Sequence, residues 1–359
     1  MSRNIISQEF WQSKRVLITG DTGFKGSWMC LWLQSLGAEI CGIGLAPPTE
    51  PSLFIEADVC IGMRHENIDI RDFEAVNCVF QSFRPEIVIH MAAQPLVRLS
   101  YLEPIETCET NVMGTVHVLE ASRRANSVQA IVNVTTDKCY ENREWHWAYR
   151  ENEPMGGHDP YSSSKGCSEL ISSAYRASFL NAEGIGLATA RAGNVIGGGD
   201  WAKDRLIPDI FRFLSQNKAV EIRNPNAIRP WQHVLEPLSG YLILAEKLYS
   251  KESNAMGSWN FGPRDNDVKT VKWIVENLGE KWGSNIGLKI QPGEHPHEAH
   301  FLKLDISKAK NQLGWEPKWT LEVALDKIVD WQKSWCAGDN MRSKCNTQIS
   351  EYRAKELLI

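Results

Sequence analysis

Short apolar runs alternate with longer segments of helical periodicity through the first half of the chain. The runs lie at 15–20, 39–45, 66–70, 86–93 and 130–136, and the helical segments lie between them at 25–37, 72–83 and 109–126. Strands separated by single helices are typical of βαβ units and a parallel sheet. Runs such as "VLI", "IVIH" and "IVNV" are almost entirely apolar, which indicates strands covered by helices on both faces. We therefore predict an α/β fold with a doubly wound parallel sheet.

The second half of the chain changes in character. A helix pattern runs from Tyr161 to about Leu180, and the run 185–197 predicts one more strand. Loops rich in Gly, Pro, Arg and His then follow, such as "GGGDWAKDRL" and "QPGEHPHEAH", and they indicate a smaller lobe lining a cleft. We predict a dinucleotide-binding domain at 1–192 with a returning segment near 231–260, a smaller C-terminal α/β substrate lobe at 193–335, and a polar tail at 336–359.

The stretch "GDTGFKG" directly follows the first strand and opens the first long helix. Its glycines Gly20, Gly23 and Gly26 permit a tight turn and a close backbone approach. The new helix presents free N–H groups and its positive dipole end to a pyrophosphate. Three glycines alone could form a bare turn, but the strand before them and the helix after them favour a dinucleotide site in a Rossmann-type domain.

The choice between NAD and NADP is less clear from the residues. The second strand ends in Gly44, Leu45 and Ala46, so it lacks the acid that usually holds the ribose hydroxyls of NAD. An Arg cluster for the 2′-phosphate of NADP is also missing there. Asp69, at the end of the third strand, can accept a hydrogen bond from the adenine amino group.

Tyr161 and Lys165 stand four residues apart in "DPYSSSKGCSEL", so both side chains leave one helix face. Such a pair could be part of a solvated surface, but behind a glycine-loop sheet it is typical of a catalytic site. A phenol has a pKa of about 10, and a base near neutrality needs a pKa roughly 3 lower. A fixed ammonium in a dry site supplies much of this decrease, helped by the positive charge of a nicotinamide.

Composition and charge exclude several other classes of function. The formal net charge is −5, so no basic excess attracts nucleic acid or an anionic membrane. Nine cysteines are scattered singly, which is typical of a reducing compartment. The N-terminal segment has no apolar signal core, and no stretch reaches the ~18 apolar residues of a spanning helix. We expect a cytoplasmic protein with no nucleic-acid or membrane partner.

These motifs together resemble the extended short-chain dehydrogenase/reductase family, the NAD-dependent epimerases and dehydratases, over roughly residues 14–335. The resemblance rests on the glycine loop, "HMAAQ", "ETNVMGTVHVLE", "TTDK", Tyr161 with Lys165, and "ARAGNVIGGGD". It implies NAD as cofactor and the following cofactor-binding residues: Gly20, Thr22, Gly23, Phe24, Lys25, Gly26, Asp69, Ile70, Ala92, Ala93, Gln94, Asn111, Thr135, Tyr161, Lys165, Arg191 and Asn194.

The stretch "TTDKCY" narrows the resemblance. In the family's sugar-nucleotide 4,6-dehydratases this stretch usually reads Ser-Thr-Asp-Glu-Val-Tyr. By that resemblance Thr136 would hydrogen-bond the sugar at O4, Asp137 would protonate the leaving C6 hydroxyl, and Lys138 replaces the usual glutamate base at C5. Together with "GFKGSWMCLWL", "HMAAQPLVRLSY" and "IRPWQHVLEPLSGYL", this departure resembles the CDP-glucose 4,6-dehydratases of bacterial dideoxysugar (O-antigen and lipopolysaccharide) biosynthesis more closely than the enzymes for dTDP-glucose or GDP-mannose.

The reaction implied is the intramolecular redox dehydration of CDP-glucose to CDP-4-keto-6-deoxyglucose. Asp137 as an acid requires a raised pKa, and Lys138 as a base requires a lowered one. A plain ion pair would shift both pKa values the opposite way. Because consecutive strand residues point to opposite faces, the strand must end before Asp137 for both groups to reach one sugar. Lys138 is either the C5 base or a residue that positions a water or the ring.

The diphosphate of a CDP-sugar needs local positive charge in an acidic protein. Arg205 and Arg229 are the candidates, although a surface ion pair is the ordinary role of such arginines. Asn194 and Asn260 match family residues that hold the pyrophosphate.

The segment "GEHPHEAH" contains His295, His297 and His300. HxH spacing can bind zinc, but no cysteine or carboxylate cluster completes a site in the sequence, so we predict no metal. A loop over the diphosphate, with His300 contacting the substrate, is the favoured interpretation.

Three alternatives remain open. A nucleotide-sugar 4-epimerase shares the glycine loop, Tyr161 and Lys165 but does not need the acid at 137, and a 4,6-dehydratase could act on another nucleotide sugar. A noncatalytic NAD-sensing protein would usually lose the tyrosine or the lysine. The resemblance also implies a homodimer or homotetramer, with the helices near 104–126 and 161–180 forming a four-helix seam.

Overall fold

A seven-stranded parallel sheet forms the centre of the molecule. The computed structural model describes residues 6–216, 218–222, 224–283, 288–290 and 302–357. The strand order is β11-β6-β5-β4-β1-β2-β3, and the bounds are β1 Arg15–Thr19, β2 Glu39–Gly44, β3 Arg64–Asn67, β4 Ile87–His90, β5 Ala130–Val134, β6 Gly186–Ala192 and β11 Gly257–Phe261. This confirms the predicted fold class, although the third strand lies at 64–67 instead of 66–70.

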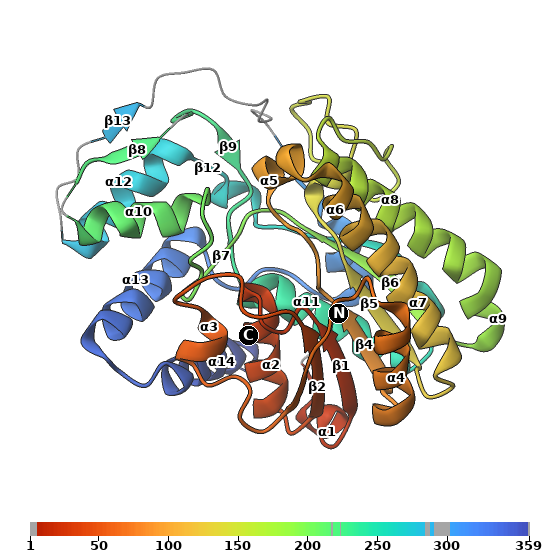
Figure 1. The fold of residues 1–359 in the computed structure, drawn as a ribbon. Coiled ribbons are helices and arrows are strands. Elements are labelled where there is room, and N and C mark those ends of the chain that lie inside the picture. The colour runs from red at the N-terminus through yellow and green to blue at the C-terminus, as the bar shows by residue number, and fades with distance from the viewer. Residues whose placement is uncertain (1–5, 217, 223, 284–287, 291–301, 358–359) are drawn as a thin grey trace.

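Helices cover both faces of the sheet (Figure 1). One face carries α2 (Phe24–Ser35) and α11 (Leu235–Tyr249), and the other carries α4 (Phe73–Phe83), α7 (Gly114–Arg124) and α8 (Pro160–Tyr175). Residues of β1 alternate between two buried cores, because Val16 and Ile18 belong to one hydrophobic cluster and Leu17 to the other. The unbroken apolar strands are thus explained by burial on both sides.

Smaller elements connect the layers. They are α1 Gln8–Trp11, α3 Leu53–Glu56, α5 Val97–Leu102, α6 Pro104–Cys108, α9 Asn181–Glu183 and the 3₁₀ turns η2 Asp137–Cys139, η4 Ser253–Ala255 and η5 Asp265–Asp267. The π-helical segment η1 Glu109–Met113 joins α6 to α7. The π-helical segment η3 Arg176–Leu180 follows α8 directly. No helix among the described residues is long and apolar enough to cross a membrane.

A second group of elements lies beyond the carboxyl ends of the strands, at the upper left of Figure 1. It comprises α10 Leu206–Ser215, α12 Val271–Trp282, α13 Leu321–Ala337 and three two-stranded sheets: β7 Val195–Ile196 with β10 Gln232–His233, β9 Ile228–Arg229 with β12 Lys269–Thr270, and β8 Val220–Ile222 with β13 Leu288–Ile290. A separate hydrophobic core built on α10, α12 and α13 holds this group together.

The C-terminal segment folds back onto the first half of the chain. Its helix α14 (Met341–Leu357) packs against α2 and α13. Tyr352 is fully buried there, with its ring edge-on to Trp32 and Trp319. Although this tail is mostly polar in sequence, α14 has one apolar face that contacts the rest of the chain.

Glu236 on α11 joins the C-terminal helices to the core. Its buried carboxylate accepts hydrogen bonds from the backbone N–H of Lys318 at 3.0 Å and of Trp319 at 2.7 Å, and from the Tyr352 hydroxyl at 2.6 Å. Burial raises the pKa of Glu236 to about 7, because these hydrogen bonds only partly offset the lost hydration.

We predict that this carboxyl makes the protein less stable as pH rises. The folded-state pKa lies above the ordinary value of 4.5, so the contribution is fully present below pH 4.5 and is lost as pH rises through about 7. The free energy of unfolding is measured with denaturant at pH 5 and at pH 8 for the wild type and for Glu236→Gln. The decrease from pH 5 to pH 8 should be larger in the wild type, by on the order of 3 kcal/mol. Glu276→Gln, at an exposed position, is the control and should keep the wild-type difference. An unchanged difference in Glu236→Gln would contradict the assignment.

Candidate active site

The glycine loop has the geometry that its sequence predicts. Gly20 has φ +76°, and a Cβ there would lie 2.7 Å from the Ala92 nitrogen at the tip of β4. A Cβ at Gly26 would lie 2.0 Å from the Gly20 carbonyl oxygen, so the start of α2 packs directly on the turn. Gly23 is the N-cap of α2 and has no side chain to occupy the free N–H groups. The loop therefore leaves a helix N-terminus open to an anion.

The turn after β5 brings the candidate acid and base together. β5 ends at Val134, and Thr136 caps the 3₁₀ turn that contains Asp137 and Lys138. The Thr136 hydroxyl donates to Asp137 Oδ1 at 3.1 Å, and both Asp137 and Lys138 line the same pocket. As the chemistry requires, the strand has ended before the pair begins.

Burial controls the charge of Asp137. Its pKa is raised because burial outweighs the attraction of Lys138 and the hydrogen bond from Thr136. Its second oxygen, Oδ2, is buried and has no hydrogen-bond partner in the described part of the chain. The folded chain itself buries this acid, since Asp137 is only 3% exposed.

Tyr161 and Lys165 are both buried on α8, as the helical spacing predicts. The Tyr161 phenol hydrogen-bonds with Thr136, which places it beside the Asp137 turn. Lys165 Nζ donates to the Val134 carbonyl at 3.3 Å, and burial lowers the Lys165 pKa to about 8.

The lowered pKa expected for Tyr161 in the complete site is not present in the chain alone. The pKa of Tyr161 is raised to about 12, not lowered, because burial disfavours the phenolate more than the Thr136 hydrogen bond favours it and the nearby Asp137 charge adds to the increase. Lys165 therefore does not make the phenol acidic without further positive charge in the site.

Cations surround the catalytic groups. Lys25, in the first turn of α2, has a pKa lowered to about 7, first by burial and then by the charges of Lys165 and Arg205. Arg205 is paired with Asp200 at 2.9 Å and also lies near Tyr161. The candidate pocket is lined by Asp137, Lys138, Asn194, Arg229 and eight further residues: Val97, Tyr140, Asn142, Gly157, His158, Asp159, Ser162 and Leu302.

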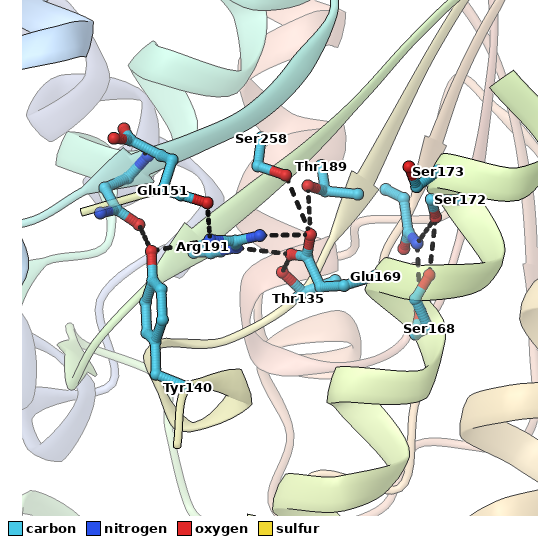
Figure 2. Close-up of polar contacts among 12 residues, drawn as sticks. Thr135, Tyr140, Glu151, Ser168, Glu169, Ser172, Ser173, Thr189, Arg191 and Ser258 are labelled. Carbon is cyan, nitrogen blue, oxygen red and sulfur yellow. Dashed lines mark hydrogen bonds and ion pairs between the residues drawn. The ribbon is translucent and has the colours of Figure 1, made fainter. Parts of the chain in front are cut away.

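Three residues predicted to bind cofactor or substrate, Thr135, Arg191 and Asn260, form hydrogen bonds within the protein. Figure 2 shows Arg191 between Tyr140 and Glu169, where its guanidinium forms a buried bidentate ion pair with the Glu169 carboxylate. The Thr135 hydroxyl donates to the same carboxylate at 2.5 Å. The Asn260 side chain is fully buried, accepts from Tyr140 at 2.7 Å and donates to two backbone carbonyls. The three side chains therefore have hydrogen-bond partners inside the protein, and their roles toward cofactor and diphosphate stay predictions.

Gln94 and Asn111, both predicted to bind cofactor, also form hydrogen bonds within the protein. The Asn111 carboxamide accepts from Gln94 N at 2.8 Å and donates to the Gln94 carbonyl and the Ser164 hydroxyl. The Gln94 side chain donates to Thr107 and accepts from Leu96 N. Through these bonds Asn111 connects the loop after β4 to Ser164 of α8.

The remaining predicted residues lie around the sheet edge. Asp69 receives three hydrogen bonds from Arg71, which lower the Asp69 pKa and leave it only partly available. Ile70 is buried against Gly114 of α7. Thr22 and Phe24 lie in the glycine loop, and Ala92 and Ala93 follow β4. His300 lies outside the described residues, as do His295 and His297. The described residues contain no cluster of three or more His, Cys, Asp or Glu that could hold a metal ion.

Two features were missed by sequence reasoning. His158 and Asn142 line the pocket, and only their closeness to Asp159 and the catalytic turn could have suggested them. The side chain of Asp21, in the glycine loop, lies close to Gly44 at the end of β2. A Cβ built on Gly44 would be 2.6 Å from Asp21 Oδ1. It pairs with His65 at 2.7 Å, and burial raises its pKa. A carboxylate thus lies beside the end of β2, where the sequence has no acid.

A glycine loop at the start of α2, a buried Tyr–Lys pair on α8 and a buried acid after β5 define an α/β enzyme of the extended short-chain dehydrogenase/reductase class. The sequence profile of the GDP-mannose 4,6-dehydratase family matches residues 17–328. The chain belongs to this family.

Two curated relatives are similar to the chain in sequence, and one solved structure is similar to it in fold. A CDP-glucose 4,6-dehydratase from Salmonella typhimurium is 56% identical over 353 residues, covering 97% of this chain and 98% of its own. A UDP-glucose 4-epimerase from Halalkalibacterium halodurans is 26% identical, covering 92% of this chain and 98% of its own. The solved structure of a dTDP-glucose 4,6-dehydratase from Streptomyces venezuelae, with NAD bound, has a TM-score of 0.78 at 22% identity and covers 91% of this chain and 99% of its own.

Proposed function

We propose that the chain is an NAD-dependent CDP-glucose 4,6-dehydratase, which converts CDP-glucose to CDP-4-keto-6-deoxyglucose and water. The Salmonella relative supports the substrate, since its identity extends along 97% of this chain. The observation that carries the reaction type is Asp137, a buried acid with an unpartnered oxygen in the same pocket as Lys138 and beside Tyr161.

The first half of the reaction uses the Tyr161 side. When bound, NAD would accept a hydride from C4 of the sugar and return it to C6 at the end. Tyr161 takes the O4 proton, and Thr136, which lies between the phenol and Asp137, orients the O4 hydroxyl. Lys165, held by the Val134 carbonyl, supplies positive charge that favours the phenolate.

The second half uses the turn after β5. The 4-ketone acidifies the C5 proton, and elimination needs a base at C5 and an acid at the C6 hydroxyl. The raised pKa of Asp137 favours its protonated form, which the acid role at the C6 hydroxyl requires. Lys138 is the candidate base, since it is half-buried on the same pocket wall. Arg229 and Asn194 would hold the diphosphate across the pocket.

For the cofactor, the glycine loop and the N-terminus of α2 would hold the pyrophosphate. The cradle fits, because side chains at Gly20 or Gly26 would collide with backbone atoms. NAD is favoured over NADP, since the Asp21 carboxylate beside Gly44 would repel a 2′-phosphate near the end of β2.

The rest of the chain fits this assignment. Residues 1–192, with the returning segment near 231–260, would form the cofactor domain, and 193–335 the nucleotide-sugar lobe; α14 then belongs to the first domain through its contact with α2. All nine cysteines are unpaired, which supports a cytoplasmic location.

The main competitor is a 4-epimerase, because a UDP-glucose 4-epimerase from Thermotoga maritima shares the fold and the family resemblance implies the same Tyr–Lys pair in epimerases. An epimerase needs no acid at 137, so product analysis decides. We expect the purified protein with NAD to convert CDP-glucose to a product that has lost one water, with no net accumulation of reduced cofactor. Parallel incubations with dTDP-glucose, UDP-glucose and GDP-mannose should give far less product by mass spectrometry. An isomer of unchanged mass would identify an epimerase and overturn the proposal.

Two substitutions should separate the halves of the reaction. Tyr161→Phe should abolish oxidation at C4, because the phenolic proton acceptor is lost. Asp137→Asn should still oxidise C4 and exchange the C5 proton with solvent deuterium, but dehydration should fall by about 100-fold or more, since the acid is gone. Quantifying deuterium at C5 alongside product formation distinguishes the two defects. Normal turnover by Asp137→Asn would remove the acid role.

The chain also exposes apolar side chains where the resemblance predicts a four-helix seam between two copies. Those within the predicted ranges lie on α6, η1 and the α8–η3 helix, and are Ile105, Met113, Leu170 and Phe179. Leu99, Tyr101 and Leu102 extend the apolar face onto α5, which contacts α6 and α8. A second copy of the chain that packs on this face would bury them.

Replacing Leu170 should therefore disturb assembly. Leu170→Glu places a charge in the proposed seam and should yield a smaller species in light scattering after size exclusion. Ile55→Glu is the matched control, because Ile55 and Leu170 are each 60% exposed but Ile55 lies on α3, outside the seam. Equal masses for the wild type and Leu170→Glu would place the interface elsewhere.

A further inference from the structure

A buried polar network joins Thr135 and Tyr140, the residues on either side of the catalytic turn (Figure 2). Its centre is the ion pair between Glu169 of α8 and Arg191 of β6, at 2.8 Å, with both side chains only 3% exposed. Burial alone would raise the pKa of Glu169, but the bonds from Arg191 and two threonine hydroxyls lower it, so the carboxylate stays ionised. A buried, fully bonded pair of this kind is weak evidence for added stability.

The two ends of the catalytic turn are attached to the two partners of this pair. On one side, the Thr135 hydroxyl donates to Glu169 at 2.5 Å, immediately before Thr136 and Asp137. On the other side, Arg191 donates to the Tyr140 hydroxyl at 2.8 Å, immediately after the turn ends at Cys139. The turn that contains the acid and the candidate base is therefore held at both ends.

The same network reaches the helix with the Tyr–Lys pair and the far edge of the sheet. Glu169 lies one helical turn after Lys165 on α8, so the carboxylate and the ammonium leave the same face of the helix. Tyr140 also donates to Asn260 of β11, whose side chain donates to the backbone of Tyr149 and Asp305. The catalytic turn, α8 and β11 are thus connected by one hydrogen-bonded network.

We propose that Glu169 and Arg191 are positioning residues that hold the turn 136–139 in register with Tyr161 and Lys165, acting through Thr135 and Tyr140. The proposal rests on the proposed function for its kinetic readout. Neither residue lines the described pocket, so they act through the turn and not on the substrate. Displacement of a catalytic group by about 1 Å can slow a reaction by two orders of magnitude, which is why a fixed turn matters.

The chain offers a closely matched pair of substitutions. Thr135 and Thr189 each donate one hydroxyl hydrogen bond to the Glu169 carboxylate, at 2.5 Å and 2.7 Å, and both are buried. Only Thr135 adjoins the catalytic turn, because Thr189 lies within β6. Substitution by valine keeps the shape of either side chain and removes one bond to the same acceptor.

We expect Thr135→Val to lower kcat roughly tenfold or more while KM for CDP-glucose changes little, since the candidate diphosphate contacts are on other loops. Thr189→Val should keep kcat within about twofold. Tyr140→Phe, which detaches the other end of the turn, should resemble Thr135→Val, and Thr135→Ser should restore most of the rate. Equal losses in Thr135→Val and Thr189→Val would show a merely structural network and overturn the proposal.

A second measurement does not depend on the reaction. Hydrogen–deuterium exchange of a peptide covering 134–141 should be faster in Thr135→Val and Tyr140→Phe than in the wild type, and unchanged in Thr189→Val. If the wild type dehydrates no nucleotide sugar, the proposed function fails while this exchange pattern still supports the positioning role. Unchanged exchange in both turn variants would refute the positioning role whatever the activity.

Discussion

The parallel direction of all strands in the central sheet is the constraint that makes a site possible. Parallel strands joined by crossover helices bring every carboxyl end to one edge. The glycine loop after β1, Ala92 after β4, the turn after β5 and Asn194 after β6 therefore meet, although almost half the chain length separates the first from the last. Helix α8 then adds Tyr161 and Lys165 from beside the sheet.

Two buried carboxylates show how the same fold separates reactive from supporting groups. Glu169 accepts five hydrogen bonds, including two from Arg191, and its pKa is lowered. Asp137 is equally buried but accepts from Thr136 on one oxygen only, and its pKa is raised. Burial is common to both, so the difference lies in the partners. Asp137, the candidate proton donor, thus keeps one carboxylate oxygen without a hydrogen bond among the described residues. Glu169, the proposed positioning residue, accepts hydrogen bonds on both oxygens.

Much of the fold could be predicted from the sequence because local signals decided it. The apolar runs of β1, β4 and β5 have no amphipathic alternation, and Gly20 and Gly26 mark a turn that no other residue fits. The third strand was misplaced because "RHEN" carries no apolar pattern. The C-terminal helix was not expected, since its buried Tyr352 meets partners more than a hundred residues away in sequence.

The site was less predictable, because the direction of a polar side chain depends on distant partners. Arg191 and Asn260 stand at strand positions suited to ligand contact, yet their partners Glu169 and Tyr140 turn them inward. The charge state of Tyr161 has the same origin. Burial keeps its pKa near 12 in the chain alone, and Lys165, with its own pKa lowered to about 8, does not reverse this. The phenol can act as a base only after more positive charge enters the site, so proton removal is coupled to assembly of the complete complex.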